Sequence, residues 1–353
     1  MPFRTFSHRG LPSAGSPEMR SLVVRSLVAL SRAVLSLAVL ARVFAGSAEA
    51  QTYPESQTYP DHPVRIIVPI GPGGAYDIIG RLLASKLSEQ IGQTFFVENR
   101  TGAGTVVGTQ AAAAAPADGY TLVIGGLSNI IFNFALYQKV PYEPDDLVPV
   151  ALVYRFPYVL VARNDLPQQD LVEIINYGRQ SPGKLTVAHP GSGSGQQIIA
   201  AAFMKLTGTT IVEVPYRSAQ AAYPDLMAGR VDLFFDSFTG ALPYITAQKV
   251  RGVALLAPRR HAKVPNLPTM MEAGLSGLGV ESWIGLFAPA RTPPEILGRL
   301  RQETRIAAAG LKDQFEQTGG ALMQIPVGET DRFIKSEFDS WTRVIHDARI
   351  RFD

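Results

Sequence analysis

The chain has two hydrophobic periodicities that alternate along its length. Short, mainly apolar runs bounded by glycine, proline or polar residues predict buried strands, and apolar residues three and four positions apart predict helices with one buried face. The predicted strands are residues 64–70, 95–98, 120–124, 185–188, 211–214, 231–235 and 250–255. Helices are predicted at 74–91 and 106–115 and between the later strands. This alternation predicts an α/β fold with mostly parallel sheets flanked by helices.

Two long apolar runs predict a division into two domains. Residues 152–162 would carry the chain from the first domain into the second, and residues 281–289 would carry it back. We therefore expect two α/β domains with a ligand cleft between them. The expected boundaries are a leader at 1–50, a first domain at 51–156, a second domain at 157–282, and a return segment with C-terminal helices at 283–353 that completes the first domain.

The C-terminal part is predicted to be helical. Thr292 and Glu295 have the spacing of a capping box, with prolines at the helix start, and Gly310 marks the end of that helix. The last helix has one apolar stripe, formed by Ile334, Phe338, Trp341 and Ile345. Such a stripe predicts packing against the core, and we expect this helix to lie on the first domain.

Two glycine-rich turns each follow a predicted strand and precede a predicted helix. The first is Gly71-Pro72-Gly73-Gly74, and the second is Gly191-Ser192-Gly193-Ser194-Gly195. A glycine turn before a helix leaves backbone N–H groups unpaired at the positive end of the helix dipole, where an anion can bind. Two such turns, one on each expected domain, predict a single anionic ligand held from both sides.

We expect the ligand to contact these turns and the ends of neighbouring strands. The candidate binding residues are Gly73, Gly74, Tyr76, Asp77, Ser128, Ser192, Gly193, Ser194, Tyr216, Asp236 and Ser237. Ser128, Asp236 and Ser237 are included because ligands of open α/β sheets bind at the carboxyl ends of strands.

Several of these residues have a structural role as an open alternative. The glycines of the first turn could simply form a tight connection. Asp77, near the third position of its helix, could cap that helix, since a bare carboxylate would repel an anionic ligand. Tyr216 could be a buried structural tyrosine, whereas Tyr76 could shape an aromatic subsite. Asp77 or Asp236 could pair with a ligand that carries an ammonium group.

The first 50 residues have the pattern of a secretory signal. Arginines are interleaved with an apolar stretch at 27–44, and Ala48-Glu49-Ala50 forms an A-x-A cleavage site. Two arginines interrupt the stretch well before it reaches the ~20 apolar residues that a transmembrane helix needs. We therefore expect export and cleavage after Ala50, with Met1 and Met19 as alternative start residues.

Charge and cysteine content narrow the classes of protein. Cleavage would remove six basic and two acidic residues from the 33 and 30 of the full chain, which leaves 27 and 28. A nearly neutral chain without a basic stripe argues against nucleic-acid binding. The absence of cysteine excludes thiolate catalysis, disulfides and a lipid-modified N-terminal cysteine. We therefore expect a free protein of the bacterial periplasm.

Common enzyme motifs are absent from the sequence. Neither turn is followed by the Gly-Lys-Ser/Thr of a P-loop, and Gln196 stands where a dinucleotide fingerprint needs its third glycine. No G-x-S-x-G elbow occurs, and the histidines lack metal-binding spacing. His189 is the one candidate general base, and a turn residue is the better interpretation. We predict no catalytic residue, no metal and no cofactor.

Several motifs in a fixed order resemble one family across essentially the whole expected mature chain. They are Gly73-Gly74-x-x-Asp77, Val97-Glu98-Asn99-Arg100-x-Gly102-Ala103-Gly104, Pro116-x-Asp118-Gly119-Tyr120-Thr121-Leu122, Val214-Pro215-Tyr216, Pro268-Thr269-x-x-Glu272-Ala273-Gly274, Ser282-Trp283-x-Gly285-Leu286-Phe287-Ala288-Pro289 and Thr292-Pro293. Together they are similar to the signature of the Bug-type periplasmic receptors of tripartite tricarboxylate transporters.

This resemblance implies a two-domain periplasmic binding protein, type II-like, that passes a small carboxylate to two integral-membrane transporter subunits. It also implies that main-chain amides and waters at two helix N-termini hold the ligand. The chain departs from the family pattern at Tyr76, where a small hydroxyl residue is common, and at Gln196-Gln197-Ile198 after the second turn, where His-Leu is common. These departures leave the identity of the carboxylate open, including an aromatic or amino-bearing one.

The sequence therefore predicts a monomeric solute receptor that is not an enzyme. Two alternatives stay open at this point. A receptor of the same build could report to a sensor kinase instead of a transporter, since the partner surface has no readable motif. An enzyme acting on a small molecule in the same cleft is the less favoured alternative.

Overall fold

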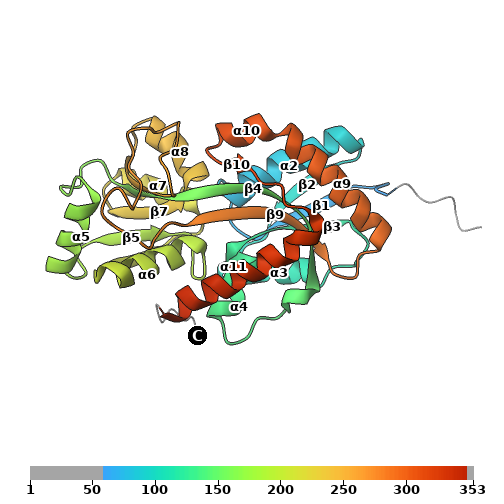
Figure 1. Cartoon of the computed structure of the whole chain (residues 1–353), viewed down its shortest axis with the longest axis horizontal. Helices are drawn as coiled ribbons and strands as arrows, with labels where there is room; N and C mark the ends of the chain where they lie inside the picture. Colours follow the sequence, from blue (N-terminus) through green and yellow to red (C-terminus); the bar gives the residue numbers. More distant parts are fainter. Residues whose placement is uncertain (1–58, 348–353) are drawn as a thin grey trace, which may run out of the picture. The chain divides into compact units, whose positions relative to one another are not determined.

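The computed structural model describes residues 59–347 (Figure 1). The expected signal segment and its cleavage site lie outside the described residues. Within residues 59–347, no helix combines the length and the hydropathy needed to cross a bilayer.

A ten-stranded sheet runs through the described residues, with the main order β2-β1-β3-β9-β4-β7-β5-β6. Its strands are β1 (Val64–Val68), β2 (Phe95–Asn99), β3 (Thr121–Gly126), β4 (Leu147–Ala162), β5 (Thr186–His189), β6 (Val212–Pro215), β7 (Leu233–Ser237), β8 (Arg251–Leu256), β9 (Glu281–Pro289) and β10 (Ala321–Leu322). Strands β1, β2 and β3 are parallel, as are β5, β6 and β7, whereas β4 and β9 pair antiparallel with their neighbours. The α/β prediction is confirmed.

The two long strands β4 and β9 connect the two parallel groups, and Figure 1 shows them side by side. β4 pairs with β9 along residues 147–157, and with β7 and β8 along residues 158–162. These are the two apolar runs that the sequence predicts as crossings, and the observed bounds of β9 match the predicted 281–289. The domain boundaries themselves stay a prediction.

Helices pack against both groups of parallel strands, β1–β3 and β5–β7. They are α2 (Ala75–Ile91), α3 (Val106–Ala113), α4 (Asn133–Leu136), α5 (Leu171–Gln180), α6 (Gly195–Thr207), α7 (Ala219–Met227), α8 (Phe238–Thr246), α9 (Pro294–Gly310), α10 (Lys312–Gln317) and α11 (Val327–Asp347), with short turns η1 (Ala103–Thr105), η2 (Leu127–Phe132) and η3 (Pro144–Asp146). In α2, the predicted apolar face of Ile79, Leu83 and Leu87 is fully buried. Gly92 ends this helix with a φ of 78°, a conformation that glycine adopts at little cost.

The C-terminal helices confirm one prediction and correct another. Trp341 of α11 packs edge-to-face on Phe132, with ring centroids 4.9 Å apart, so the last helix lies on the segment that follows β3. The predicted capping box before α9 is wrong. The Thr292 hydroxyl donates to the carbonyl of Pro289 at 2.7 Å, and Pro293 occupies the N-cap without a side-chain hydrogen bond. Proline offers no side-chain acceptor to cap a helix.

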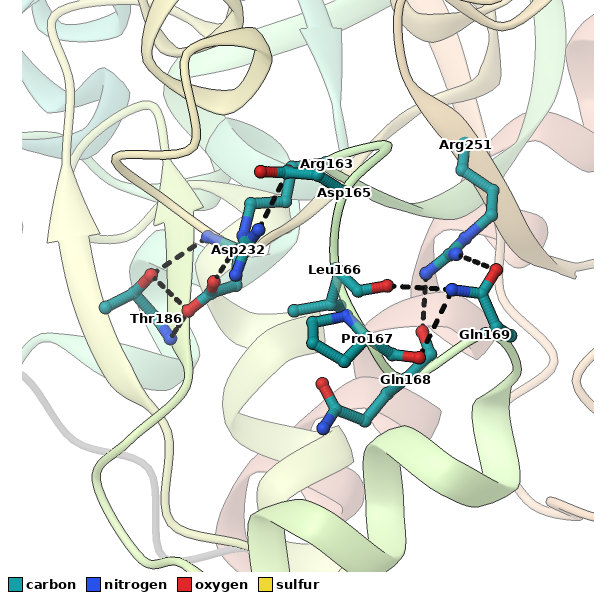
Figure 2. A network of polar contacts seen from close by, with 9 residues as sticks. All are labelled: Arg163, Asp165, Leu166, Pro167, Gln168, Gln169, Thr186, Asp232 and Arg251. Atoms are coloured by element: carbon teal, nitrogen blue, oxygen red, sulfur yellow. Dashed lines mark hydrogen bonds and ion pairs between the residues drawn. The ribbon is translucent and has the colours of Figure 1, made fainter.

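A polar network, drawn in Figure 2, links three strand ends in the β5–β7 group. Arg163 follows β4, Asp232 precedes β7, and Thr186 begins β5. The Nε of Arg163 donates to Asp232 Oδ1 at 2.8 Å, and Asp232 Oδ2 accepts from the Thr186 amide and hydroxyl at 2.9 Å each. Nearby, Arg251 donates to the Gln168 carbonyl and to Gln169 Oε1, which fixes the loop before α5. These contacts fix the start of β5, at the opposite end of the strand from the second glycine turn.

Candidate ligand site at two helix N-termini

The two glycine turns have the same local structure. Gly73 and Gly193 each precede the helix N-cap and have φ values of 85° and 78°. In both turns the third helical residue bonds back to this glycine: Asp77 Oδ2 accepts the Gly73 N–H at 3.0 Å, and Gln197 Oε1 accepts the Gly193 N–H at 2.8 Å. The turns are therefore equivalent in structure although their sequences differ.

This arrangement reduces the number of amides that the turns leave unpaired. One glycine amide in each turn is used by a side chain of its own helix, as in a capping box. The N–H groups of Gly74, Ala75 and Tyr76 at α2, and those of Ser192 and Gln196 at α6, have no hydrogen-bond acceptor among residues 59–347. These amides are the donors that an anionic ligand can use.

Asp77 caps its helix. Its carboxylate is 4% exposed and accepts from the Gly73 amide, from Asn99 Nδ2 at 2.8 Å and from Arg81. Burial raises the pKa of Asp77, but the hydrogen bonds from Arg81, Gly73 and Asn99 together with the charge of Arg81 outweigh it, so the pKa lies below its usual value. Because both oxygens are already bonded, the side chain has the structural role left open by the sequence.

Ser128 bridges the N-termini of α2 and α6. Its backbone N–H donates to the hydroxyl of Tyr76, the second residue of α2, at 3.3 Å. Its Oγ accepts from the backbone N–H of Gly195, the first residue of α6, at 3.1 Å. A Cβ at Gly195 would lie 2.6 Å from the Tyr158 hydroxyl, so a larger residue would displace this buried tyrosine. Three parts of the chain thus meet at one buried serine.

Tyr76 contributes its hydroxyl to this junction, and its ring is buried in the core. The side chain is 4% exposed, and burial raises the pKa of Tyr76. A Cβ at Gly126 would lie 2.2 Å from the Tyr76 hydroxyl. No exposed ring face is therefore presented by this tyrosine to form an aromatic subsite.

Asp236 lies at the carboxyl end of β7 and is fully buried. Its carboxylate accepts from the Tyr223 hydroxyl at 2.8 Å, from Gln196 Nε2 at 3.3 Å and from the Ser237 amide at 2.7 Å. Burial raises the pKa of Asp236 to about 6, although these hydrogen bonds act in the opposite direction. Through Gln196, the second residue of α6, Asp236 is connected to the second turn.

The remaining four side-chain candidates lie in three different environments. Ser194 and Ser237 are N-caps, and their hydroxyl oxygens accept from Gln197 N and Gly240 N. The Tyr216 hydroxyl donates to Asp225 Oδ2 at 2.9 Å, on the neighbouring α7. Ser192 is exposed, and its carbonyl would lie 2.2 Å from a Cβ at Gly104 in η1. The structure thus joins Tyr76, Ser128, Asp236 and the turns, and directs the Tyr216 hydroxyl elsewhere.

Two residues that the sequence gave no reason to select connect α7 and α8 to the first turn. Gln220 Nε2 of α7 donates to the Gly73 carbonyl at 2.9 Å. The Tyr244 hydroxyl of α8 in turn donates to Gln220 Oε1 at 2.6 Å. Neither residue belongs to a recognisable motif, and both come together only through the fold.

A catalytic centre or metal site is not evident in the described part of the chain. Within residues 59–347, no group of three or more His, Asp and Glu residues could hold a metal ion. His189, at the end of β5, is 3% exposed, and its Nδ1 has no hydrogen-bond partner among these residues. No nucleophile is placed beside it by any observed hydrogen bond.

Comparison with known proteins identifies the family. Residues 79–350 match the family model described as the tripartite tricarboxylate transporter family receptor. Protein BugT of Bordetella pertussis is 32% identical over 310 residues, which are 87% of this chain and 95% of BugT. The chain therefore belongs to the tripartite tricarboxylate transporter receptor family, and the Bug-type resemblance is confirmed.

Two solved structures show the same fold. Rpa4515 of R. palustris, solved with adipate, has a TM-score of 0.79 and 30% identity, over 83% of this chain and 99% of Rpa4515. MatC of Rhodopseudomonas palustris, with bound malate, has a TM-score of 0.77 and 31% identity, over 81% of this chain and 100% of MatC. The chain is thus a solute-binding receptor of a family whose members are periplasmic.

Proposed function

We propose that this receptor binds a small dicarboxylate at the N-termini of α2 and α6. The observation that carries the proposal is the Ser128 bridge, because it links the Tyr76 side chain of the first turn of α2 to the Gly195 amide of the first turn of α6, and both helices begin with unpaired amides. Helix N-termini favour anions through both their free N–H groups and their dipoles. The adipate of Rpa4515 and the malate of MatC support a dicarboxylate.

The available donors are sufficient for useful affinity. A hydrogen bond to a charged group contributes roughly 1.5 to 3 kcal/mol, and a helix N-terminus adds about 0.3 to 1 kcal/mol. Four or five such contacts, reduced by an association cost of about 4 kcal/mol or more, reach the roughly −8 kcal/mol of a micromolar complex. No cofactor is required for binding of this strength.

The aromatic and amino-bearing ligands have less support than a simple dicarboxylate. Tyr76 is buried and offers only its hydroxyl to the junction. Asp236 is fully buried, and its oxygens already accept hydrogen bonds from Tyr223, Gln196 and Ser237. A ligand ammonium group would have to displace these donors from a carboxylate that water cannot reach.

The proposal includes the physiological setting. The receptor acts as a monomer in the periplasm after cleavage behind Ala50, delivers its ligand to two integral-membrane subunits, and catalyses no reaction. N-terminal sequencing of periplasmic material should give Gln51 as the first residue. Recovery of the intact leader on a membrane-bound product would overturn the export part of the proposal.

Titration calorimetry tests the ligand class. Adipate and malate should each bind with one site per chain, whereas adipamide and malamide should bind at least a hundredfold more weakly. The diamides keep the shape of the acids but lack the charge that the helix N-termini favour. Equal affinity of an acid and its diamide would mean that the helix N-termini do not hold the ligand.

A further inference from the structure

The described part of the chain contains a cavity of about 490 Å³. It is bounded by the middle of α6, the start of β9, the segment 270–280 and the second half of α11. None of the residues predicted to hold the carboxylate lines it. Its volume lies within the range of pockets that bind small molecules.

The wall of this cavity is mostly apolar. Ile199, Met270 and Leu278 form part of it and are almost completely buried. Met271 and Val344 also line it, and they expose 64% and 41% of their surface. An apolar occupant would remove this surface from water at about 25 cal/mol per Å², so the wall favours a ligand with an apolar body.

The charges on the wall are all negative. Glu281 and Glu337 are the only charged residues that line the cavity, and no Lys, Arg or His lies among the lining residues. Glu337 is half-buried and accepts from the indole N–H of Trp283 at 3.2 Å. Burial raises the pKa of Glu337, and hydrogen bonds from Trp283 and Trp341 offset this only in part. The hydrogen bonds therefore replace only part of the hydration that the charged carboxylate loses on burial.

Trp341 adds a second element of cation recognition. It lines the same cavity as Glu337, one helical turn further along α11. An indole ring attracts an ammonium group through its quadrupole, and the attraction grows as the site becomes drier. A carboxylate, an indole and an apolar wall form the combination that suits an organic cation.

We propose that this cavity binds a small organic ammonium ion with an apolar body, with the ammonium group at Glu337 and the apolar part against Met270 and Leu278. This site is independent of the carboxylate site and goes beyond the proposed function. A carboxylate ligand is disfavoured here, because it would face two carboxylates without a cation between them.

The intrinsic tryptophan fluorescence reports directly on this cavity. The chain contains two tryptophans: Trp283 donates to Glu337, and Trp341 lines the cavity. Hexylammonium is the probe, and 1-hexanol is its uncharged control of equal chain length. Hexylammonium should change the emission with saturation and bind at least tenfold more tightly than 1-hexanol.

Three variants locate the effect. Glu337→Gln keeps an acceptor for Trp283 but removes the charge, and should reduce the preference for hexylammonium to threefold or less. Val344→Lys, at an exposed position on the wall, should weaken hexylammonium at least tenfold without disturbing the core. Glu329→Gln, on the exposed first turn of α11 and outside the cavity, should bind like the wild type.

The proposal fails if hexylammonium gives no saturable change, or if 1-hexanol binds equally well. It also fails if Glu337→Gln and Val344→Lys both bind hexylammonium like the wild type, since the ammonium ion would then lie elsewhere. Calorimetry with malate on the same variants keeps the two sites apart, because the carboxylate site should bind malate unchanged in all three.

Discussion

Removal of the Gln220 side chain should weaken ligand binding although this residue is not expected to touch the ligand. Gln220 of α7 donates to the carbonyl of Gly73 at 2.9 Å, and so joins the β5–β7 part of the fold to the first glycine turn. In the proposed function the ligand is held between these same two parts. The hydrogen bond from Gln220 holds the β5–β7 part and the first glycine turn in the arrangement that would hold the ligand. It should therefore contribute to the affinity.

The size of the effect follows from the bond. A neutral hydrogen bond contributes about 0.5 to 1.5 kcal/mol net, which corresponds to a Kd about 2- to 13-fold higher in Gln220→Ala. Most of the change should appear as faster dissociation, because related complexes differ mainly in their off-rates. Gln302→Ala, an exposed substitution on α9 without an observed side-chain bond, is the matched control and should bind like the wild type.

A double-mutant cycle separates this contact from a general loss of stability. The Tyr244 hydroxyl donates to Gln220 Oε1 at 2.6 Å and orients the amide. Tyr244→Phe alone should raise the Kd, whereas Gln220→Ala with Tyr244→Phe should be no worse than Gln220→Ala, because the hydroxyl then has nothing to orient. Stopped-flow dissociation and calorimetry give these values. Strictly additive effects, or an unchanged Kd in Gln220→Ala, would refute the reasoning.

Three further predictions concern Asp236, Asp232 and the second turn. Burial raises the folded-state pKa of Asp236 from 3.8 to about 6. The folded protein therefore binds this proton more tightly than the unfolded protein does. The free energy of unfolding should fall as the pH rises from about 4 to about 6, because the folded protein then loses the proton that it holds more tightly. This loss of unfolding free energy is on the order of 3 kcal/mol, and urea unfolding across the same pH range should show no such loss in Asp236→Asn. Parallel pH profiles of the wild type and Asp236→Asn would contradict the prediction. Asp232→Ala removes the acceptor of three hydrogen bonds at the strand ends and should lower the free energy of unfolding by about 3 kcal/mol. A change below about 0.5 kcal/mol would show that the network does not stabilise the fold. Gly193→Val should abolish ligand binding, because Gly193 has a φ of 78° and a Cβ there would lie 2.7 Å from the Tyr137 hydroxyl. Ser194→Ala should reduce the binding free energy by only about 0.5 to 1.5 kcal/mol. A folded Gly193→Val that binds like the wild type would mean that the turn is only a connection.

The fold was largely predictable because its elements have strong local signals. The runs at 152–162 and 281–289 are apolar apart from Arg155, Glu281 and Ser282, as is typical of strands buried on both faces, and they form most of β4 and all of β9. The first five residues of β4, 147–151, were not predicted as strand because Pro149 interrupts them, and proline is unfavourable inside a sheet. The Thr292 capping box failed because the hydroxyl found a nearer acceptor in the Pro289 carbonyl.

The candidate site was predictable only where backbone geometry dictates the residue. Gly73 and Gly193 need positive φ values, which the sequence pattern of the turns already indicates. Ser128 was selected as a binding candidate from its place after β3, but its bond to Gly195 joins residues 67 positions apart and has no sequence signal. Gln220 and Tyr244 were missed for the same reason, since a long-range hydrogen bond depends on how the helices pack.

The position of a bound dicarboxylate tests the central claim most directly. A crystal structure of the protein with malate or adipate should place carboxylate oxygens within about 3 Å of backbone N–H groups at the first turn of α2, among them Ala75 and Tyr76, and of Gln196 at α6. A ligand whose carboxylates contact only basic side chains, with neither helix N-terminus in hydrogen-bond range, would contradict the account.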